Sequence, residues 1–485
     1  MKLQSIHIFL LLCVIAFTAC TSEKASPDYN QFPEAIGKII INKCATPGCH
    51  NAQSKDATGG LNLESWDKMF EGDRNGATII PYRSDFSTLL FYTNTYNDLG
   101  ISLVPMMPYN KAPLTKEEII TLKNWITQGA PDRNGFVKFS DNPNRKKFYV
   151  TNQGCDVVTV FDEETGLPMR YIDVGKIVNT EAPHMVKVSP DGQYWYVIFY
   201  AGSTIQKYRT SDDSFVGEID IGNANWNTFA ITSDSKKAFC VDWSASGKVY
   251  YLDLENLTIL SHYQGSGLFI YPHGVAVNSS TTTLYVTAQT GNFIYKIDIS
   301  DPLSPNINQI SLNGLPFSSA SSLDPHEIAI SPDGLKYYVT CQKSNEVRVF
   351  NTSNDLLIAT IHTDIYPQEM SFSTSTNYLF VSCPEDTAAF PGKRGCISVI
   401  DYTNNLYFKN IFTGFQPHGL VVDDDKKQVL VANRNVNPKG AAPHHTTKCG
   451  GRDGYVTFID MNTLNLVPDK KIEVSVDPYS VAFRK

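Results

Sequence analysis

The sequence from residue 328 to residue 351 decides the fold, because it contains the repeating unit of most of the chain. It begins with an apolar strand and a turn, IAISPDG at 328–334, continues with YYVTC at 337–341 and ends with RVFN at 348–351. Short runs rich in β-branched and aromatic residues, separated by an Asp-Gly turn, are typical of antiparallel strands. The unit therefore predicts a meander of short strands.

The last strand of this unit recurs along the chain from about residue 140 to the end. Its seven copies lie at 159–162, 206–209, 250–253, 295–298, 348–351, 398–401 and 457–460. Repetition of one short-stranded unit is the signature of a repeat architecture, and four-stranded units arranged in a ring form a β-propeller. The sequence thus predicts a mainly β protein with a seven-bladed β-propeller.

The ends of the repeat region predict how the ring closes. The first unit begins at Phe148 without an inner strand, whereas the chain ends with an inner strand at 478–483 that no blade follows. We expect this last strand to complete the first blade, because an open ring would leave two sheet edges unpaired. The YVTN run at 149–152 and the turns resemble the YVTN family of propellers over residues 145 to 485, and we assign the propeller to 140–485.

A second motif, CATPGCH at 44–50, precedes the repeats. Covalent haem requires two neighbouring thiols, Cys44 and Cys49, which bond the vinyl groups, and an imidazole, His50, which binds the iron. Four residues separate the cysteines instead of the usual two, so Pro47-Gly48 is expected to bulge. A zinc site would need two more ligands, but no further Cys or His occurs before Cys155. Haem and a small disulfide loop both remain open at this point.

A methionine loop favours haem over the disulfide loop. Met106 and Met107 lie in a proline-rich loop at 103–110, just before a segment at 114–126 that is predicted to be a helix. Thr115 can cap this helix with Glu118, and apolar residues recur at three- and four-residue steps. A methionine thioether often closes the sixth position of haem iron in electron-transfer proteins, whereas a lone methionine more often fills a core.

Further motifs in this region resemble a known family. GGLNL at 59–63, Ile80-Pro81, STLL at 87–90, Met107-Pro108 and the segment 117–131 resemble the small c-type cytochrome domain typified by planctomycete proteins, over about residues 35 to 133. The resemblance implies a small all-α haem domain, assigned to 34–135, with haem c as cofactor. It also implies roles for single residues: Cys44 and Cys49 as thioether anchors, His50 as the proximal ligand, and Met107 as the distal ligand with Met106 as the alternate.

The N-terminus carries an export signal. Lys2 precedes an apolar run at 6–17, and small residues lead to Cys20. This resembles a bacterial lipoprotein signal peptide at 1–19, in which Cys20 becomes lipidated, followed by a polar tether at 20–33. The alternative is an ordinary signal peptide that leaves Cys20 free. The resemblance implies a protein exported to the cell envelope and anchored to a membrane through lipid, facing either the periplasm or the exterior.

Composition and motifs narrow the function further. With 42% hydrophobic and 19% charged residues and a net charge of −8, the chain has material for two cores and no excess of basic residues for nucleic-acid phosphates. It lacks a phosphate-binding glycine loop, a nucleophile elbow and a paired-carboxylate signature. Electron transfer is therefore favoured over hydrolase or transferase activity, and whether the protein is an enzyme stays open. Export permits disulfides, and we predict one between Cys383 and Cys396 across a hairpin.

One polar residue from each blade is expected at the mouth of the central channel. These residues are His184, Asn227, His273, His326, Gln368, His418 and Tyr479. The four histidines suggest copper or another borderline metal, whereas the simpler interpretation is a water-filled channel with a polar lining. Insertions at 384–396 and 434–454 are expected over the same mouth, and the second contains His444, His445 and Cys449.

These observations lead to one main functional hypothesis and two alternatives. The main hypothesis is an envelope-anchored c-type cytochrome that transfers electrons, with a propeller that binds a redox partner protein or a small ligand at its histidine-rimmed face. In the first alternative the propeller is a copper-dependent oxidoreductase that receives electrons from the haem. In the second it is a non-catalytic binding platform.

Overall fold

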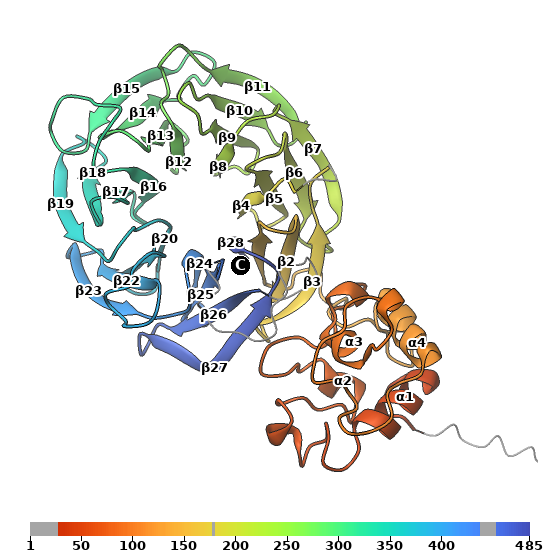
Figure 1. The fold of residues 1–485 in the computed structure, drawn as a ribbon. Coiled ribbons are helices and arrows are strands. Elements are labelled where there is room, and N and C mark those ends of the chain that lie inside the picture. The colour runs from red at the N-terminus through yellow and green to blue at the C-terminus, as the bar shows by residue number, and fades with distance from the viewer. Residues whose placement is uncertain (1–27, 177–179, 437–452) are drawn as a thin grey trace, which may run out of the picture.

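The computed structural model describes residues 28–176, 180–436 and 453–485. A helical region, residues 28–139, is followed by a ring of seven four-stranded sheets (Figure 1). The prediction of a mainly β, seven-bladed propeller is thus confirmed. Among the described residues, no helix is both long enough and apolar enough to cross a membrane.

The helical region is built from short elements. They are α1 (Glu34–Ile39), the π-helical turn η1 (Ile40–Cys44), η2 (Lys55–Ala57), α2 (Trp66–Met69), η3 (Ser84–Phe86), α3 (Thr88–Thr93), η4 (Asn97–Leu99) and α4 (Lys116–Thr127). The longest helix, α4, begins as predicted, with a capping box between Thr115 and Glu118. Its apolar positions Ile119, Leu122 and Ile126 are buried in the core of this region.

Each blade of the propeller is an antiparallel meander that runs from an inner strand to an outer strand. The inner strands are β28 (Pro478–Arg484), β4 (Pro183–Val188), β8 (Trp226–Ile231), β12 (Pro272–Val277), β16 (Pro325–Ile330), β20 (Met370–Phe372) and β24 (Pro417–Asp423). The second strands are β1 (Lys147–Asn152), β5 (Tyr194–Phe199), β9 (Lys237–Asp242), β13 (Thr283–Ala288), β17 (Lys336–Cys341), β21 (Tyr378–Cys383) and β25 (Gln428–Asn433).

The outer half of each blade completes the meander. The third strands are β2 (Val157–Asp162), β6 (Thr204–Arg209), β10 (Val249–Asp253), β14 (Phe293–Asp298), β18 (Glu346–Asn351), β22 (Cys396–Asp401) and β26 (Gly454–Asp460). The outer strands are β3 (Leu167–Asp173), β7 (Phe215–Asp220), β11 (Thr258–Tyr263), β15 (Asn306–Ser311), β19 (Leu357–His362), β23 (Leu406–Ile411) and β27 (Asn465–Val474). Second strands are almost fully buried, whereas outer strands such as β11 are largely exposed, so the apolar core lies between adjacent blades.

The C-terminal strand closes the ring as predicted. β28 pairs with β1 in the first blade, with Phe148 opposite Phe483 and Val150 opposite Val481. The rings of Phe148 and Phe483 stack with their centroids 4.6 Å apart. The first blade therefore contains both the earliest and the latest strand of the propeller, which leaves no inner strand unpaired.

The helical region docks beside the ring, against the outer strand of the first blade (Figure 1). The guanidinium of Arg83 donates hydrogen bonds to the carboxylate of Asp173 at 2.9 Å and to the backbone carbonyl of Tyr171 at 3.0 Å. Buried apolar residues of the two parts, among them Phe70 and Met169, belong to one continuous hydrophobic core. The two parts are thus joined by packing as well as by the connecting chain.

Candidate functional site

The Cys44–His50 segment forms a compact turn that brings the two cysteines together. The amide of Cys49 donates to the carbonyl of Thr46 at 2.9 Å, and the amide of His50 donates to the carbonyl of Cys44 at 3.1 Å. Gly48 has a φ of +79°, which is what a glycine at the third position of a type II turn after proline adopts. The predicted bulge at Pro47-Gly48 is thus present.

Cys44, Cys49, His50 and Met107 line one cavity of about 590 Å³. Its walls are mostly apolar and include Leu61, Leu63, Leu89, Tyr92 and Pro105. Pockets for cofactors usually measure about 300–1,000 Å³ and are lined by apolar side chains with a few polar groups. The four residues predicted to act together are therefore placed around one space of suitable size.

Burial changes the protonation behaviour of two of these residues. It lowers the pKa of His50, although the nearby Asp73 carboxylate and Leu61 carbonyl partly oppose this effect. Burial, together with the proximity of Cys49, raises the pKa of Cys44 to about 12. At neutral pH the imidazole is therefore neutral, as a metal ligand must be, and Cys44 is a thiol.

The structure distinguishes between the two methionines. Met107 faces the cavity, and its amide donates to the carbonyl of Tyr92 next to it at 2.7 Å. Met106 does not line the cavity, and 45% of its surface is exposed. Lys43, which also lines the cavity, forms an ion pair with Glu118 of α4 at 2.5 Å, which ties the cysteine turn to the long helix.

Six of the predicted channel residues lie at the starts of the inner strands, and Gln368 lies just before β20, but the four histidines do not converge on one point. His184, His273, His326 and His418 are all buried. The ring centroids of His273 and His326 are 3.8 Å apart, whereas His184 lies 6.4 Å from His273 and His418 lies 6.3 Å from His326. His418 instead stacks on Tyr479 at 3.7 Å. The histidines therefore form one close pair and two separate members.

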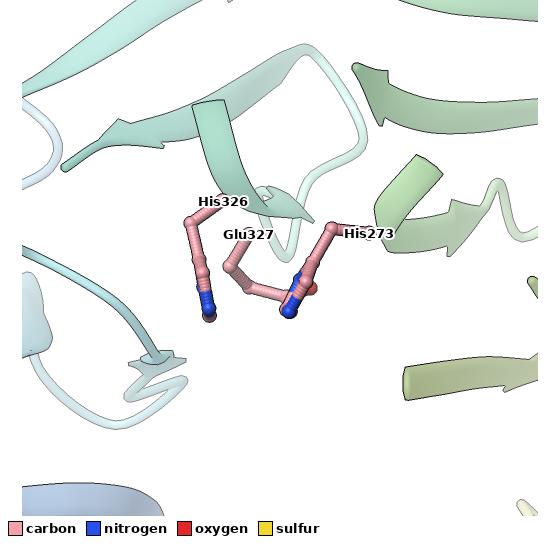
Figure 2. Close-up of side chains that lie close together, drawn as sticks. All are labelled: His273, His326 and Glu327. Atoms are coloured by element: carbon pink, nitrogen blue, oxygen red, sulfur yellow. The ribbon is translucent and has the colours of Figure 1, made fainter. Parts of the chain in front are cut away.

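Sequence reasoning missed a carboxylate that joins the close pair. One nitrogen each of His273 and His326 and one oxygen of Glu327 lie within 4.8 Å of one another (Figure 2). Successive residues of a regular strand point to opposite faces, so Glu327 would be expected to face away from the side of His326. However, the pairing of β16 with β17 shifts register between Pro325 and Ile328. This bulge turns both side chains toward the channel.

Two charged residues, Glu369 and Lys187, lie close enough to Glu327 to shift its pKa. Burial, together with the charge of Glu369, raises the pKa of Glu327 to about 8, although the nearby Lys187 opposes the shift. Burial also raises the pKa of Glu369 to about 7, again against Lys187. Burial lowers the pKa of His273 to about 4. The histidine ring thus adjoins one buried carboxyl group, Glu327, one half-buried carboxyl group, Glu369, and one lysine.

The first insertion lies at the same mouth as the histidines, as expected. The amide of Gln416, two residues before His418, donates to the carbonyl of Arg394 at 2.9 Å, and Arg394 pairs with Glu385. Of the second insertion, residues 437–452 lie outside the described residues, and with them His444, His445 and Cys449. Cys20 and the whole signal peptide lie outside them too.

The cysteines of the propeller differ in state. Cys383 and Cys396 are directly opposite in the pairing of β21 with β22, as predicted, but both are free thiols here, so their disulfide stays a prediction. Cys155 is disulfide-bonded. Cys240 and Cys341 are free and buried, and burial raises the pKa of each well above the usual thiol range.

Comparison with known proteins supports the fold and not an activity. No family model and no curated protein matches the chain. Among solved structures, a functionally unknown protein from Desulfotomaculum acetoxidans DSM 771 is similar, with a TM-score of 0.53 and 12% identity over 70% of this chain and 98% of that one. Kuenenia stuttgartiensis hydrazine synthase aligns with a TM-score of 0.48 and 17% identity over 64% of this chain and 93% of that one. What the chain shares with the first of these proteins is the β-propeller fold.

Proposed function

We propose that this protein is an envelope-anchored c-type cytochrome that transfers electrons, and that its propeller binds a redox partner protein or a small ligand. The observation that carries the proposal is the cavity at which Cys44, Cys49, His50 and Met107 meet. These are the two thiols, the imidazole and the thioether that covalent haem with His and Met ligation requires.

The lining of the cavity fits haem. Its leucines suit the apolar faces of a porphyrin, and its volume of about 590 Å³ is in the range of cofactor pockets. The Nδ1 atom of His50 is buried without a full hydrogen bond among the described residues, although the carbonyl of Leu61 lies near. Haem bound here supplies a reversible one-electron change at its iron, and a thioether ligand favours the reduced state.

The chain's own residues would hold the ligands in place and connect the cavity with the propeller. The carbonyl of Tyr92 anchors the amide of Met107, and the Lys43–Glu118 ion pair anchors the cysteine turn. Asn75 lines the cavity, and its carbonyl accepts a hydrogen bond of 2.8 Å from the amide of Glu473 in β27. Asn75 would therefore contact both a haem in this cavity and the propeller. This short connection supports a joint role for the two parts.

The disulfide at Cys155 supports export, because structural disulfides persist in oxidising compartments. Lipid anchoring through Cys20 is tested by a Cys20→Ala variant with an intact signal sequence. We expect the wild-type protein in the membrane fraction and the variant in the soluble envelope fraction. A wild-type protein that fractionates with soluble proteins would contradict the anchor.

The haem assignment is tested by expressing the chain with a haem c maturation system. We expect a pyridine haemochrome spectrum of one haem per chain that survives acid-acetone extraction. The double variant Cys44→Ser/Cys49→Ser should lose covalent attachment, whereas Met106→Ala, outside the cavity, should keep it. A colourless wild-type protein would overturn the proposal, and haem that is fully extractable would overturn covalent attachment.

A second candidate function, metal-dependent oxidation or reduction in the propeller, is favoured by the contact between His273, His326 and Glu327. This candidate differs from the hypothesis of a non-catalytic binding platform in one measurable property, the presence of a bound metal ion in the channel. An oxidoreductase needs a resident metal in the channel, whereas a binding platform needs none.

A further inference from the structure

We infer that the propeller channel contains a binding site for a divalent first-row transition metal ion, formed by the imidazoles of His273 and His326 and the carboxylate of Glu327. This site is separate from the haem cavity and does not rest on the proposed cytochrome function. It also differs from a ring of four histidines, because His184 and His418 lie outside it.

The three donor atoms are close enough for a single ion. They lie within 4.8 Å of one another (Figure 2). Donors at about 2.0–2.2 Å from a tetrahedral zinc ion are separated by roughly 3.4 Å, so the separation between any two donors has to shorten by at most about 1.4 Å to close the site. All three residues come from inner strands whose backbone is fixed by the ring.

Unpartnered polar atoms give independent evidence for a ligand. Within the described residues, Nδ1 of His326 and Oε2 of Glu327 are buried and form no hydrogen bond, and Nδ1 of His273 is buried without a full hydrogen bond, although the backbone carbonyl of His326 lies near. Each of the three residues is more than nine-tenths buried, with exposures of 5%, 2% and 7%. An unpaired buried polar group costs about 1–3 kcal/mol, so two of them beside a third that is only partly satisfied need an explanation. A metal ion that accepts their lone pairs provides it.

The backbone is shaped to bring the donors together. Gly274 follows His273, and a Cβ atom there would lie 2.5 Å from the carbonyl oxygen of His326 and 2.8 Å from Cα of Glu327. The absence of a side chain at this position lets β12 approach β16 closely enough for the two imidazoles to meet at 3.8 Å. The bulge in β16 then adds the carboxylate.

The opposite side of the channel repeats this geometry without the carboxylate. Gly419 follows His418, and a Cβ atom there would lie 2.4 Å from the carbonyl oxygen of Tyr479, on whose ring His418 stacks. The residue that corresponds to Glu327 is Ser480, whose hydroxyl accepts a hydrogen bond from the amide of Val186 at 3.3 Å. The chain thus contains a matched control for the metal site.

The donor set indicates the class of metal. Two imidazoles and one carboxylate, with a coordination position left for water or substrate, are used for zinc in His₂Glu sites and for iron(II) in facial triads. The set lacks the thiolate and thioether ligands that select copper(I). The carboxylate offsets one of the two positive charges of the ion, and a second acid, the half-buried Glu369, lies close enough to interact electrostatically with Glu327.

Zinc provides a direct test. Haem-loaded, full-length protein without an affinity tag is stripped with a chelator, dialysed against zinc and analysed for zinc and iron per chain. We expect one zinc per chain in the wild type and in His418→Ala. Glu327→Gln, which preserves shape, and His273→Ala should weaken zinc binding by at least about a hundredfold, since even outer-shell changes cost 10–100-fold. Circular dichroism compares the folding of all variants.

The outcomes separate the possibilities. Zinc bound equally well by Glu327→Gln would overturn the site as described, as would a wild type that binds none. Loss of zinc in folded His418→Ala would show that the whole histidine ring is used and would also overturn it. If His273→Ala fails to fold, the isosteric Glu327→Gln decides. Iron content reports the haem separately, so failure of this inference and failure of the cytochrome proposal are distinguishable.

Discussion

The ring of Phe86 in the helical region stacks on the ring of Tyr171 in the outer strand of the first blade, with centroids 4.2 Å apart and planes inclined by 19°. The guanidinium of Arg83 lies over the ring of Phe86, 4.4 Å from its centroid. This aromatic pair and the cation thus form one part of the interface between the helical region and the propeller. Buried aromatic pairs contribute more than their buried area alone.

Removal of this pair should loosen the docking. We expect Phe86→Ala to lower the free energy of unfolding of the helical region by about 3 kcal/mol, because it leaves a cavity between two packed surfaces. The helical region should then melt before the propeller, and protease should cut the connection at residues 134–146 faster. The control is Phe408→Ala, at a position with 54% exposure, which should change stability by less than about 1 kcal/mol. Equal effects of the two variants would contradict the docking role.

The two methionines should differ in their effect on the redox potential. Met107 lines the cavity and Met106 does not, so Met107→Ala should remove the thioether ligand, whereas Met106→Ala should not. Since a thioether favours reduced iron, the midpoint potential should fall in the first variant and stay unchanged in the second. Spectroelectrochemical titration measures both. A fall in potential for Met106→Ala alone would assign the ligand to the other methionine.

Gly274 should be intolerant of even one methyl group. Its Cβ atom would meet backbone atoms of β16, which have no room to move, so Gly274→Ala should destabilise the protein by about 1–3 kcal/mol and weaken zinc binding. Thermal unfolding and zinc titration measure the two effects. In the control, Gly217→Ala in outer strand β7, the new methyl meets only the end of the flexible Leu257 side chain, and both effects should be small.

Asp424 should make the propeller sensitive to acid. Partial burial raises its pKa, but hydrogen bonds from Ser373, Ser375 and Thr374 outweigh this and hold the pKa of Asp424 well below the usual range. A carboxyl whose pKa is depressed by folding stabilises the protein above its unfolded pKa of about 3.9, and the stabilisation is lost as the pH falls below that value.

The corresponding variant is Asp424→Asn. At pH 7 we expect it to lower the free energy of unfolding by about 1–2 kcal/mol, a range reduced for the partial exposure of the site. The difference from the wild type should shrink as the pH falls below about 4. Chemical denaturation at several pH values measures it, with Asp469→Asn on the exposed part of β27 as the control. A difference that grows toward acid would refute the assignment.

The repeat pattern was sufficient to predict the propeller, because every third strand ends in the same short motif and the last inner strand has no blade of its own. Cys44, Cys49 and His50 lie close together in sequence, so the turn at Pro47-Gly48 is enough to bring them together. Met107 lies far from them in the chain, and its place at the same cavity was predicted from the family resemblance and not from spacing.

The remaining features depend on contacts that no spacing encodes. Glu327 was missed because strand alternation predicts that it faces away, and only the bulge in β16 reverses that. The four histidines were expected as one ring, but the close approach permitted by Gly274 selects two of them. The Phe86–Tyr171 stack joins residues far apart in the chain, and neither residue carries a motif.

The pairing of β28 with β1 has a consequence for the order of assembly during synthesis. The helical region and β3, the outer strand on which it docks, are complete long before Pro478 is made, so the contacts between them can form early, whereas the hydrogen bond between Asn75 and Glu473 forms later. The ring has no inner strand for its first blade until the ribosome has added residues 478–484. Any chain that terminates prematurely is therefore left with an exposed β-edge, which makes truncated products visible to proteases and prone to aggregate.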